Sequence, residues 1–103
     1  MWAQLIKMRL KPGKEAGLES LLKHLQATEQ PGSGLVRSTT MTDQKDPSLV
    51  YTMVVFESEE QARAREQDPR REEGLQNVRA MMAEMFEGAP EFVDLNVVKE
   101  VAT

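Results

Sequence analysis

The chain has 103 residues, of which 40% are hydrophobic and 29% are charged, and its formal net charge is −4. These values predict one globular domain over residues 1–103 and exclude intrinsic disorder, and the negative charge argues against nucleic acid or an anionic membrane as a partner. Cysteine is absent, which excludes disulfide bonds, a thiolate nucleophile and thiolate metal ligands.

The N-terminal residues do not have the basic and then apolar layout of a signal peptide. No apolar run approaches the roughly twenty residues that span a bilayer. We therefore expect a soluble protein that makes no membrane contact and is located in the cytoplasm.

The first third of the chain predicts a strand and then a helix. Residues 2–10 alternate in the manner of a strand, with Trp2, Ile6, Met8 and Leu10 on one apolar face. Pro12-Gly13 ends this strand. Residues 14–30 are predicted to form an amphipathic helix, because four leucines recur at the i, i+3, i+4 and i+7 spacing: Leu18, Leu21, Leu22 and Leu25.

A hairpin is predicted after the breaker Pro31-Gly32-Ser33-Gly34. Residues 35–42 are rich in β-branched side chains, and residues 49–56 are almost continuously apolar. The segment between them has the length and the turn-forming residues that join antiparallel neighbours.

Two helices and a last strand complete the pattern. Ser58 and Gln61 have the spacing of a capping box at the start of a short polar helix. Asp68-Pro69 then starts a longer helix, which is predicted to end at Gly88 and to be followed by a strand over residues 92–101. The apolar stripe of the longer helix comprises Leu75, Val78, Met82 and Met85, with Met81 and Phe86 beside them.

This order of elements, β-α-β-β-α-β, predicts an α+β fold of the ferredoxin-like type, a four-stranded antiparallel sheet with helices on one face. The strand over residues 49–56 is apolar on both faces, although helices of one chain can cover only one side of the sheet. A second copy of the sheet is the simplest cover for the other side. We therefore expect a homodimer.

Short segments of the chain, taken in order, resemble the antibiotic biosynthesis monooxygenase (ABM) family. The resemblance covers nearly the whole chain and is carried by Lys11-Pro12-Gly13-Lys14, Pro31-Gly32-Ser33-Gly34-Leu35, Asp46-Pro47, Phe56-Glu57-Ser58-Glu59-Glu60 and Asp68-Pro69. It implies a dimeric α/β barrel, with a pocket in each subunit between the sheet and the helices.

The resemblance also implies a function, a monooxygenase or oxidoreductase that needs no cofactor and oxidises a small aromatic or quinol-like molecule. Departures from the family pattern favour the alternative of a non-catalytic small-molecule-binding or stress-related module. Phe56 stands where members often have tryptophan, and Arg65 stands where a histidine is common. The asparagine that the haem-degrading members have on strand one is also absent, so haem degradation is not expected. An isomerase or cyclase is a third hypothesis, because related dimeric barrels include such enzymes.

Several side chains are candidates for the walls of this pocket, and none is identified as catalytic. Strand parity places Thr52 with Phe56 and places Arg37 and Thr39 with Leu35. Arg37 is interpreted either as holding a ligand phenolate or carboxylate, or as pairing with an acidic residue. The aromatic candidates are explained equally well by core packing. The candidate residues are Trp2, Met8, Arg37, Thr39, Thr52, Phe56 and Arg65.

The other charged or titratable groups have simpler interpretations. His24, the single histidine, lies at the edge of the leucine stripe and is interpreted as a boundary residue, with a general base or metal ligand as the alternative. One histidine without cysteine does not predict a metal site. The arginines at 63, 65, 70 and 71 alternate with acidic residues, which is typical of a solvated helix face.

Overall fold

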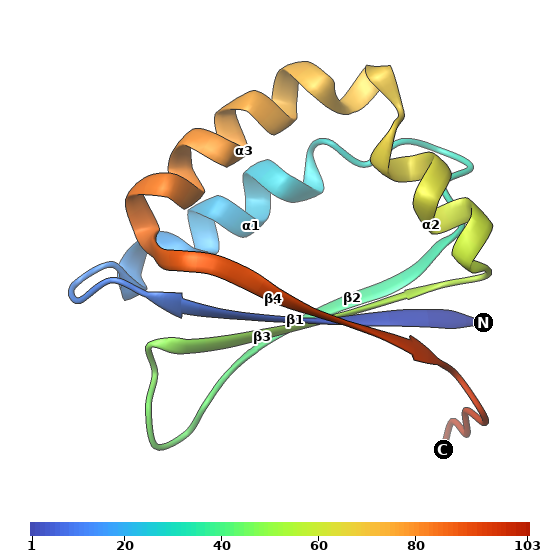
Figure 1. The fold of residues 1–103 in the computed structure, drawn as a ribbon, viewed down its shortest axis with the longest axis horizontal. Coiled ribbons are helices and arrows are strands. Elements are labelled where there is room, and N and C mark those ends of the chain that lie inside the picture. Colours follow the sequence, from blue (N-terminus) through green and yellow to red (C-terminus); the bar gives the residue numbers. More distant parts are fainter.

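The computed structural model describes residues 1–103 and contains one four-stranded antiparallel sheet with all the helices on one face (Figure 1). The strand order β2-β3-β1-β4 places the strands from the two ends of the chain side by side. The predicted ferredoxin-like arrangement is confirmed. The strands are β1 (Trp2–Leu10), β2 (Leu35–Thr42), β3 (Leu49–Phe56) and β4 (Phe86–Asn96), and the helices are α1 (Leu18–Gln26), α2 (Glu59–Glu66) and α3 (Glu72–Met85), with 3₁₀ turns η1 (Glu15–Gly17) and η2 (Pro69–Arg71).

The central strand β1 pairs antiparallel with both β3 and β4. Ile6 lies opposite Thr52 on one side and opposite Phe92 on the other. Directly opposed residues of an antiparallel pair project from the same face of the sheet. The even-numbered residues of β1 and their partners therefore form the surface that the helices cover.

Two apolar clusters hold the helices on this surface. The larger lies under α1 and α3, where the most deeply buried side chains include Leu10 and Val50. The smaller lies under α2 and consists of Trp2, Phe56 and Ala62. The helices α1 and α3 thus share one cluster on the sheet, and α2 contacts the sheet through the other. None of the helices is long and apolar enough to cross a membrane.

The predicted helix over residues 14–30 is shorter in the structure. It begins as the 3₁₀ turn η1, and its α-helical part ends at Gln26. The hydroxyl of Thr28 donates a hydrogen bond of 2.7 Å to the carbonyl oxygen of Leu25. A threonine hydroxyl that donates a hydrogen bond to a carbonyl oxygen of the helix competes with the backbone hydrogen bonds that would continue the helix. Residues 27–34 therefore form a loop.

The boundary between α3 and β4 was also predicted wrongly. The helix ends at Met85, and Phe86 is already extended, with φ −111° and ψ 146°. Phe86 pairs with Leu10 and is buried in the larger cluster, which favours an early start of the strand. Gly88, with φ +65°, lies within β4 where its register against β1 shifts, so this glycine belongs to a β-bulge instead of a helix end. The strand ends at Asn96, before the predicted residue 101.

The capping residues of α2 and η2 act as the sequence predicts. Ser58 Oγ accepts a hydrogen bond from the backbone N–H of Gln61 at 3.2 Å, and Asp68 Oδ1 accepts one from the N–H of Arg70 at 2.9 Å. The Gln61 side chain returns to the Ser58 hydroxyl at 3.0 Å, whereas a full capping box would use the Ser58 backbone N–H.

Gly34 is the point at which the loop between α1 and β2 contacts the start of α2. Its φ is +80°, and its carbonyl oxygen accepts a hydrogen bond from Glu57 N–H at 2.9 Å. A Cβ atom at this position would lie 2.7 Å from Cδ of Gln61. The loop therefore approaches α2 closely only because residue 34 has no side chain.

Gly34→Ala should destabilise the protein more than Gly32→Ala. Both glycines have φ +80°, so each substitution costs about 1–2 kcal/mol of backbone strain. Only residue 34 adds a clash, because a Cβ at residue 32 meets nothing within 4 Å. Urea unfolding of the two variants measures the difference, and equal losses would show that Gln61 moves aside freely.

Candidate functional site

A cavity of about 940 Å³ lies between the helices and the covered face of the sheet. Of its 27 lining residues, 16 are hydrophobic, and they come from the strands and from α1, α2 and α3. Ligand pockets for drug-sized molecules measure about 300–1,000 Å³ and are mostly apolar with few polar groups. The space is therefore of a size and character that suits a small organic molecule.

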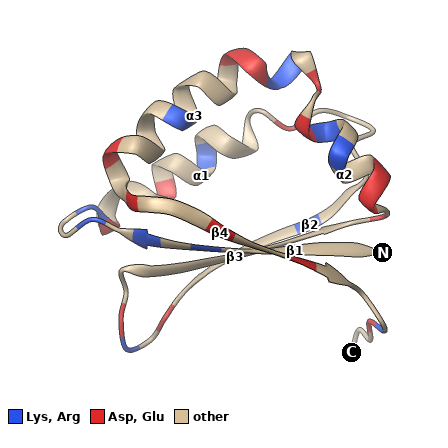
Figure 2. Ribbon diagram, in the orientation of Figure 1, with Lys and Arg blue, Asp and Glu red and all other residues tan.

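One end of the cavity has aromatic walls. The rings of Trp2 and Phe56 lie with their centroids 6.2 Å apart at 46°, and both side chains are buried. The Arg63 guanidinium lies 5.0 Å from the Trp2 ring, and that of Arg65 lies 5.4 Å from the Phe56 ring. Arg63 also pairs with Asp94 of β4 at 2.9 Å, which ties α2 to the edge of the sheet. Both rings thus lie beneath cations of α2. Figure 2 marks the basic positions on the ribbon of α2 in blue.

The floor of the cavity contains a pair of hydroxyl groups. Thr40 of β2 and Thr52 of β3 lie opposite each other in the register, and their Oγ atoms are 3.1 Å apart. A hydroxyl can donate one hydrogen bond and accept others, so the pair retains capacity to bond a polar group of a ligand within an otherwise apolar surface.

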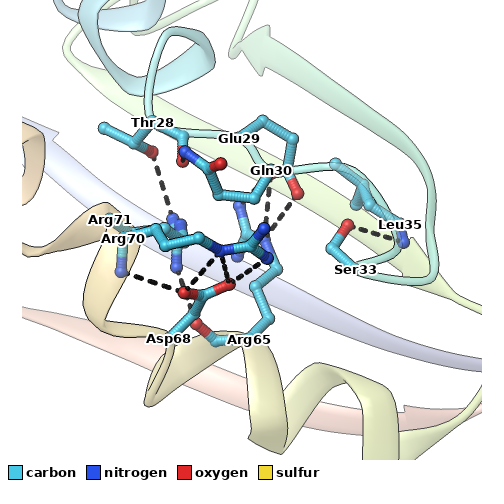
Figure 3. A network of polar contacts seen from close by, with 9 residues as sticks. All are labelled: Thr28, Glu29, Gln30, Ser33, Leu35, Arg65, Asp68, Arg70 and Arg71. Atoms are coloured by element: carbon cyan, nitrogen blue, oxygen red, sulfur yellow. Dashed lines mark hydrogen bonds and ion pairs between the residues drawn. The ribbon is translucent and has the colours of Figure 1, made fainter.

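Polar side chains gather where α2 and η2 meet the loop after α1 (Figure 3). Arg65 donates to Oε2 of Glu29 through Nη2 at 2.7 Å and Nε at 2.9 Å, and Nε also donates to Oε1 at 3.3 Å. Partial burial opposes ionisation of Glu29, but hydrogen bonds from Arg65 and Ser33 and the nearby positive charges outweigh it. The pKa of the Glu29 carboxyl is therefore lowered, and the group stays ionised.

Arg71 is the buried member of this group, with 4% of its surface exposed. Its Nη2 donates to Thr28 Oγ1 at 3.3 Å, and its Nη1 donates to the carbonyl oxygen of Arg65 at 3.2 Å. Its Nε has no hydrogen-bond partner. Burial, and then the positive charge of Arg65, lower the pKa of the Arg71 guanidinium, with Glu29 and Asp68 opposing them.

Five of the seven residues predicted for the pocket line this cavity. They are Trp2, Met8, Thr52, Phe56 and Arg65. Whether they contact a substrate remains a prediction.

Arg37 and Thr39 do not line the cavity, so the expectation that they share a face with Leu35 is wrong. The register shifts between Leu35, opposite Phe56, and Arg37, opposite Val55. Val55 and Phe56 are consecutive in β3 and project from opposite faces of the sheet. Because of the bulge, Arg37 lies opposite Val55, so Arg37 and Thr39 project from the uncovered face. There Arg37 pairs with Glu100, which agrees with the structural interpretation of this arginine.

Sequence reasoning missed Glu29, Thr28 and Arg71. Glu29 was assigned to a helix, and Arg71 to a solvated face, although the structure buries Arg71 against Thr28, 43 residues away. Helical spacing predicts only contacts within a few residues, so no local pattern marked this contact. Asp68-Pro69 was the one available signal, because it starts the turn that carries Arg71.

His24 lies outside the cavity, as the boundary interpretation predicted. The side chain is exposed, and Nδ1 donates to the carbonyl oxygen of Ser20 at 2.8 Å. No group of three or more His, Asp or Glu side chains is arranged to hold a metal ion.

Comparison with known proteins places this geometry in a family. The model of the antibiotic biosynthesis monooxygenase (ABM) family matches residues 1–77. Comparison with curated proteins finds no match.

Solved structures share the fold over almost the whole chain. A protein from Caulobacter crescentus, named as a candidate antibiotic biosynthesis monooxygenase, has a TM-score of 0.77 at 15% identity, with 95% of this chain and 90% of that chain covered. One from Chloroflexus aurantiacus with the same candidate name has a TM-score of 0.70 at 22% identity, covering 99% and 98%. SnoaB, a cofactor-independent oxygenase from Streptomyces nogalater, has a TM-score of 0.75 at 16% identity, covering 99% and 97%.

The fold and the cavity define a ferredoxin-like domain with a cavity between its sheet and its helices. Because the family model matches most of the sequence, the chain belongs to the antibiotic biosynthesis monooxygenase family.

Glu29→Gln should lower stability by about 1 kcal/mol at neutral pH, because it replaces a charge-assisted pair with a neutral one. A carboxyl whose pKa is lowered on folding stabilises the folded state above its unfolded pKa, near 4.5, and loses that contribution as the pH falls through the lowered pKa. The difference in the free energy of unfolding between wild type and Glu29→Gln should therefore become smaller as the pH is lowered. Urea unfolding at pH 7 and in steps below pH 4.5 measures it.

Glu19→Gln is the matched control for this experiment. Glu19 is exposed, and its carboxylate lies 3.9 Å from Lys23, so its substitution should change stability little at any pH. Equal effects of the two substitutions would contradict a special role of the Arg65–Glu29 pair.

Proposed function

We propose that the chain is a cofactor-independent monooxygenase that oxidises a small aromatic or quinol-like molecule inside the cavity. The observation that carries the proposal is the cavity itself, whose aromatic wall and mainly apolar lining suit a flat organic substrate. Membership of the ABM family supports the type of reaction.

In a monooxygenase step, one atom of O₂ enters the substrate and the other leaves as water. For an aromatic methylene group, the carbon loses two hydrogens and becomes a carbonyl, and those hydrogens leave in the water. An electron-rich substrate that has lost a proton can supply the electrons itself, so the protein has to orient it and exclude water. The apolar lining provides that exclusion, and the Thr40–Thr52 pair provides hydrogen bonds for orientation.

Phe56 is the proposed central contact of the substrate ring. It stands where family members often have tryptophan, it is 3% exposed, and its ring is flanked by Trp2 and by the Arg65 guanidinium. Stacked and tilted arrangements of this kind favour planar ligands.

One feature of the site favours the alternative, a non-catalytic binding module on the same scaffold. The single histidine lies outside the cavity, and Glu29 is held ionised by Arg65, which makes its carboxylate a weak base. Binding of an aromatic molecule without oxygen consumption would identify this alternative.

Assembly into a homodimer through the uncovered face of the sheet is part of the proposal. This face carries Leu5, Tyr51, Met53, Val93 and Leu95, which are only half-buried in one chain. Contiguous apolar surface of this kind is usually covered by a partner. A second copy of the same sheet presents the same apolar side chains.

Phe56→Ala should weaken binding of planar hydroquinones and anthrones in folded protein and reduce the oxygen consumption that they support. Calorimetry gives the affinity, and an oxygen electrode gives the turnover. Truncating a buried phenylalanine costs about 3–5 kcal/mol of stability, so both measurements belong below the unfolding transition.

Phe86→Ala is the matched control. Its ring is equally deep, with 7% exposure, but belongs to the other core cluster and does not line the cavity. Phe86→Ala should lower the free energy of unfolding by a similar amount and leave the affinity for the planar aromatic ligands nearly unchanged. Equal affinities for Phe56→Ala and wild type would place the binding site elsewhere, and wild type that binds but consumes no oxygen would favour the binding module.

Tyr51→Asp and Met53→Asp should convert a dimer into monomers or insoluble protein, because each would bury a charge in the apolar interface. Analytical ultracentrifugation measures the state. Gln44→Asp, in the exposed hairpin turn, adds the same charge away from that face and should leave the dimer intact. A monomeric wild type, or dimers in all three variants, would contradict the proposed assembly.

A further inference from the structure

The most unusual polar group of the molecule is the guanidinium of Arg71. An arginine guanidinium has five N–H donors, and this one makes two hydrogen bonds, to Thr28 Oγ1 and to the Arg65 carbonyl oxygen. Its Nε is fully buried and has no partner. A buried donor without an acceptor costs free energy, and such groups in native proteins call for an explanation.

The positive charge of Arg71 is also unpaired. The nearest acidic groups are taken by other arginines: Glu29 by Arg65 at 2.7 Å, and Asp68 by Arg70 at 2.7 Å (Figure 3). No carboxylate lies within ion-pair distance of Arg71. One cation is therefore left without an acidic partner in a buried position, and buried charges are normally paired.

Arg71 lies at the cavity, near its aromatic wall. Both Arg71 and Phe56 line the space, and Arg65 connects them, since its guanidinium lies over the Phe56 ring and its carbonyl oxygen accepts from Arg71. A flat molecule lying against Phe56 would thus have a buried cation within the same enclosure.

We propose that Arg71 binds an anionic oxygen, a carboxylate or a phenolate, of an aromatic ligand whose ring lies against Phe56. This inference rests on the proposed function of the cavity and narrows it to acidic aromatic molecules. Arginine suits the role because its planar fork matches carboxylate geometry and keeps its charge when buried. Arg37, the other arginine considered for such a contact, lies on the opposite face of the sheet.

A purely structural role of Arg71 makes a different prediction. In that role the side chain only holds the loop after α1 to η2 through Thr28, and ligand charge has no influence on affinity. In the binding role, the anion compensates the unpaired charge of the guanidinium. Two ligands that have the same ring but differ in charge distinguish the structural role of Arg71 from the binding role.

The experiment measures binding of naphthalene-2-carboxylate and of naphthalene-2-carboxamide to the full chain by calorimetry. Trp2, the single tryptophan, lies on the cavity wall and gives an independent fluorescence signal. The carboxylate should bind roughly tenfold or more tightly than the amide, since hydrogen bonds to charged groups exceed neutral ones by this much. This comparison uses wild-type protein, so it is decisive even if a variant does not fold.

Arg71→Gln should abolish the preference for the carboxylate, and Arg71→Lys, which keeps the charge but not the planar fork, should reduce it. Arg70→Gln is the matched control, because Arg70 is an exposed neighbour paired with Asp68, and it should retain the full preference. Equal wild-type affinities for the two ligands, or a preference that persists in folded Arg71→Gln, would overturn the inference while leaving the aromatic cavity in place. If neither ligand binds and no other planar aromatic does, the proposed function fails as well.

Discussion

The register of β1 between its two neighbours is the constraint on which the rest of the structure depends. With Trp2 opposite Phe56 and Ile6 opposite both Thr52 and Phe92, every second residue of the three strands is presented to the helices. A slip of one residue would exchange the two faces, replacing the cavity floor with Tyr51, Met53 and their neighbours. The aromatic wall and both core clusters follow from this alignment, and the register of β2 against β3 adds the threonine pair.

The second constraint is the attachment of α2 and η2 to the loop after α1. Gly34 lies close to Gln61 because residue 34 has no side chain. Glu29 accepts hydrogen bonds from Arg65, and Thr28 accepts one from Arg71 (Figure 3). These contacts close the cavity at the end where its walls are aromatic. They also place a positive charge and an unpaired donor inside a low-dielectric space, which lowers stability in the absence of a compensating anion. Proteins tolerate such groups mainly at functional sites.

The two ends of the covered face therefore differ in kind. Under α1 and α3 the sheet is packed by aliphatic side chains and methionines, with Leu10 and Val50 almost fully enclosed. Under α2, whose only apolar residues are two alanines, the rings of Trp2 and Phe56 and the guanidinium groups of Arg63 and Arg65 form one end of the cavity. The cavity continues beneath α1 and α3, where Leu21, Val50 and Val78 of the larger cluster also line it, so the core and the cavity share one face of the sheet.

Local sequence determined most of the elements. The bounds of β1, β2 and β3, the caps Ser58 and Asp68 and the ferredoxin-like order follow from alternation, helical spacing and turn residues, because each of these signals acts within a few neighbouring residues. Only the tertiary structure decided three matters. A bulge after Leu35 turned Arg37 and Thr39 away from the cavity. Pairing of Phe86 with Leu10 ended α3 early. Contacts between residues far apart in the chain buried Arg71 against Thr28. Each depends on the free energy of packing one element against another, which no local pattern contains.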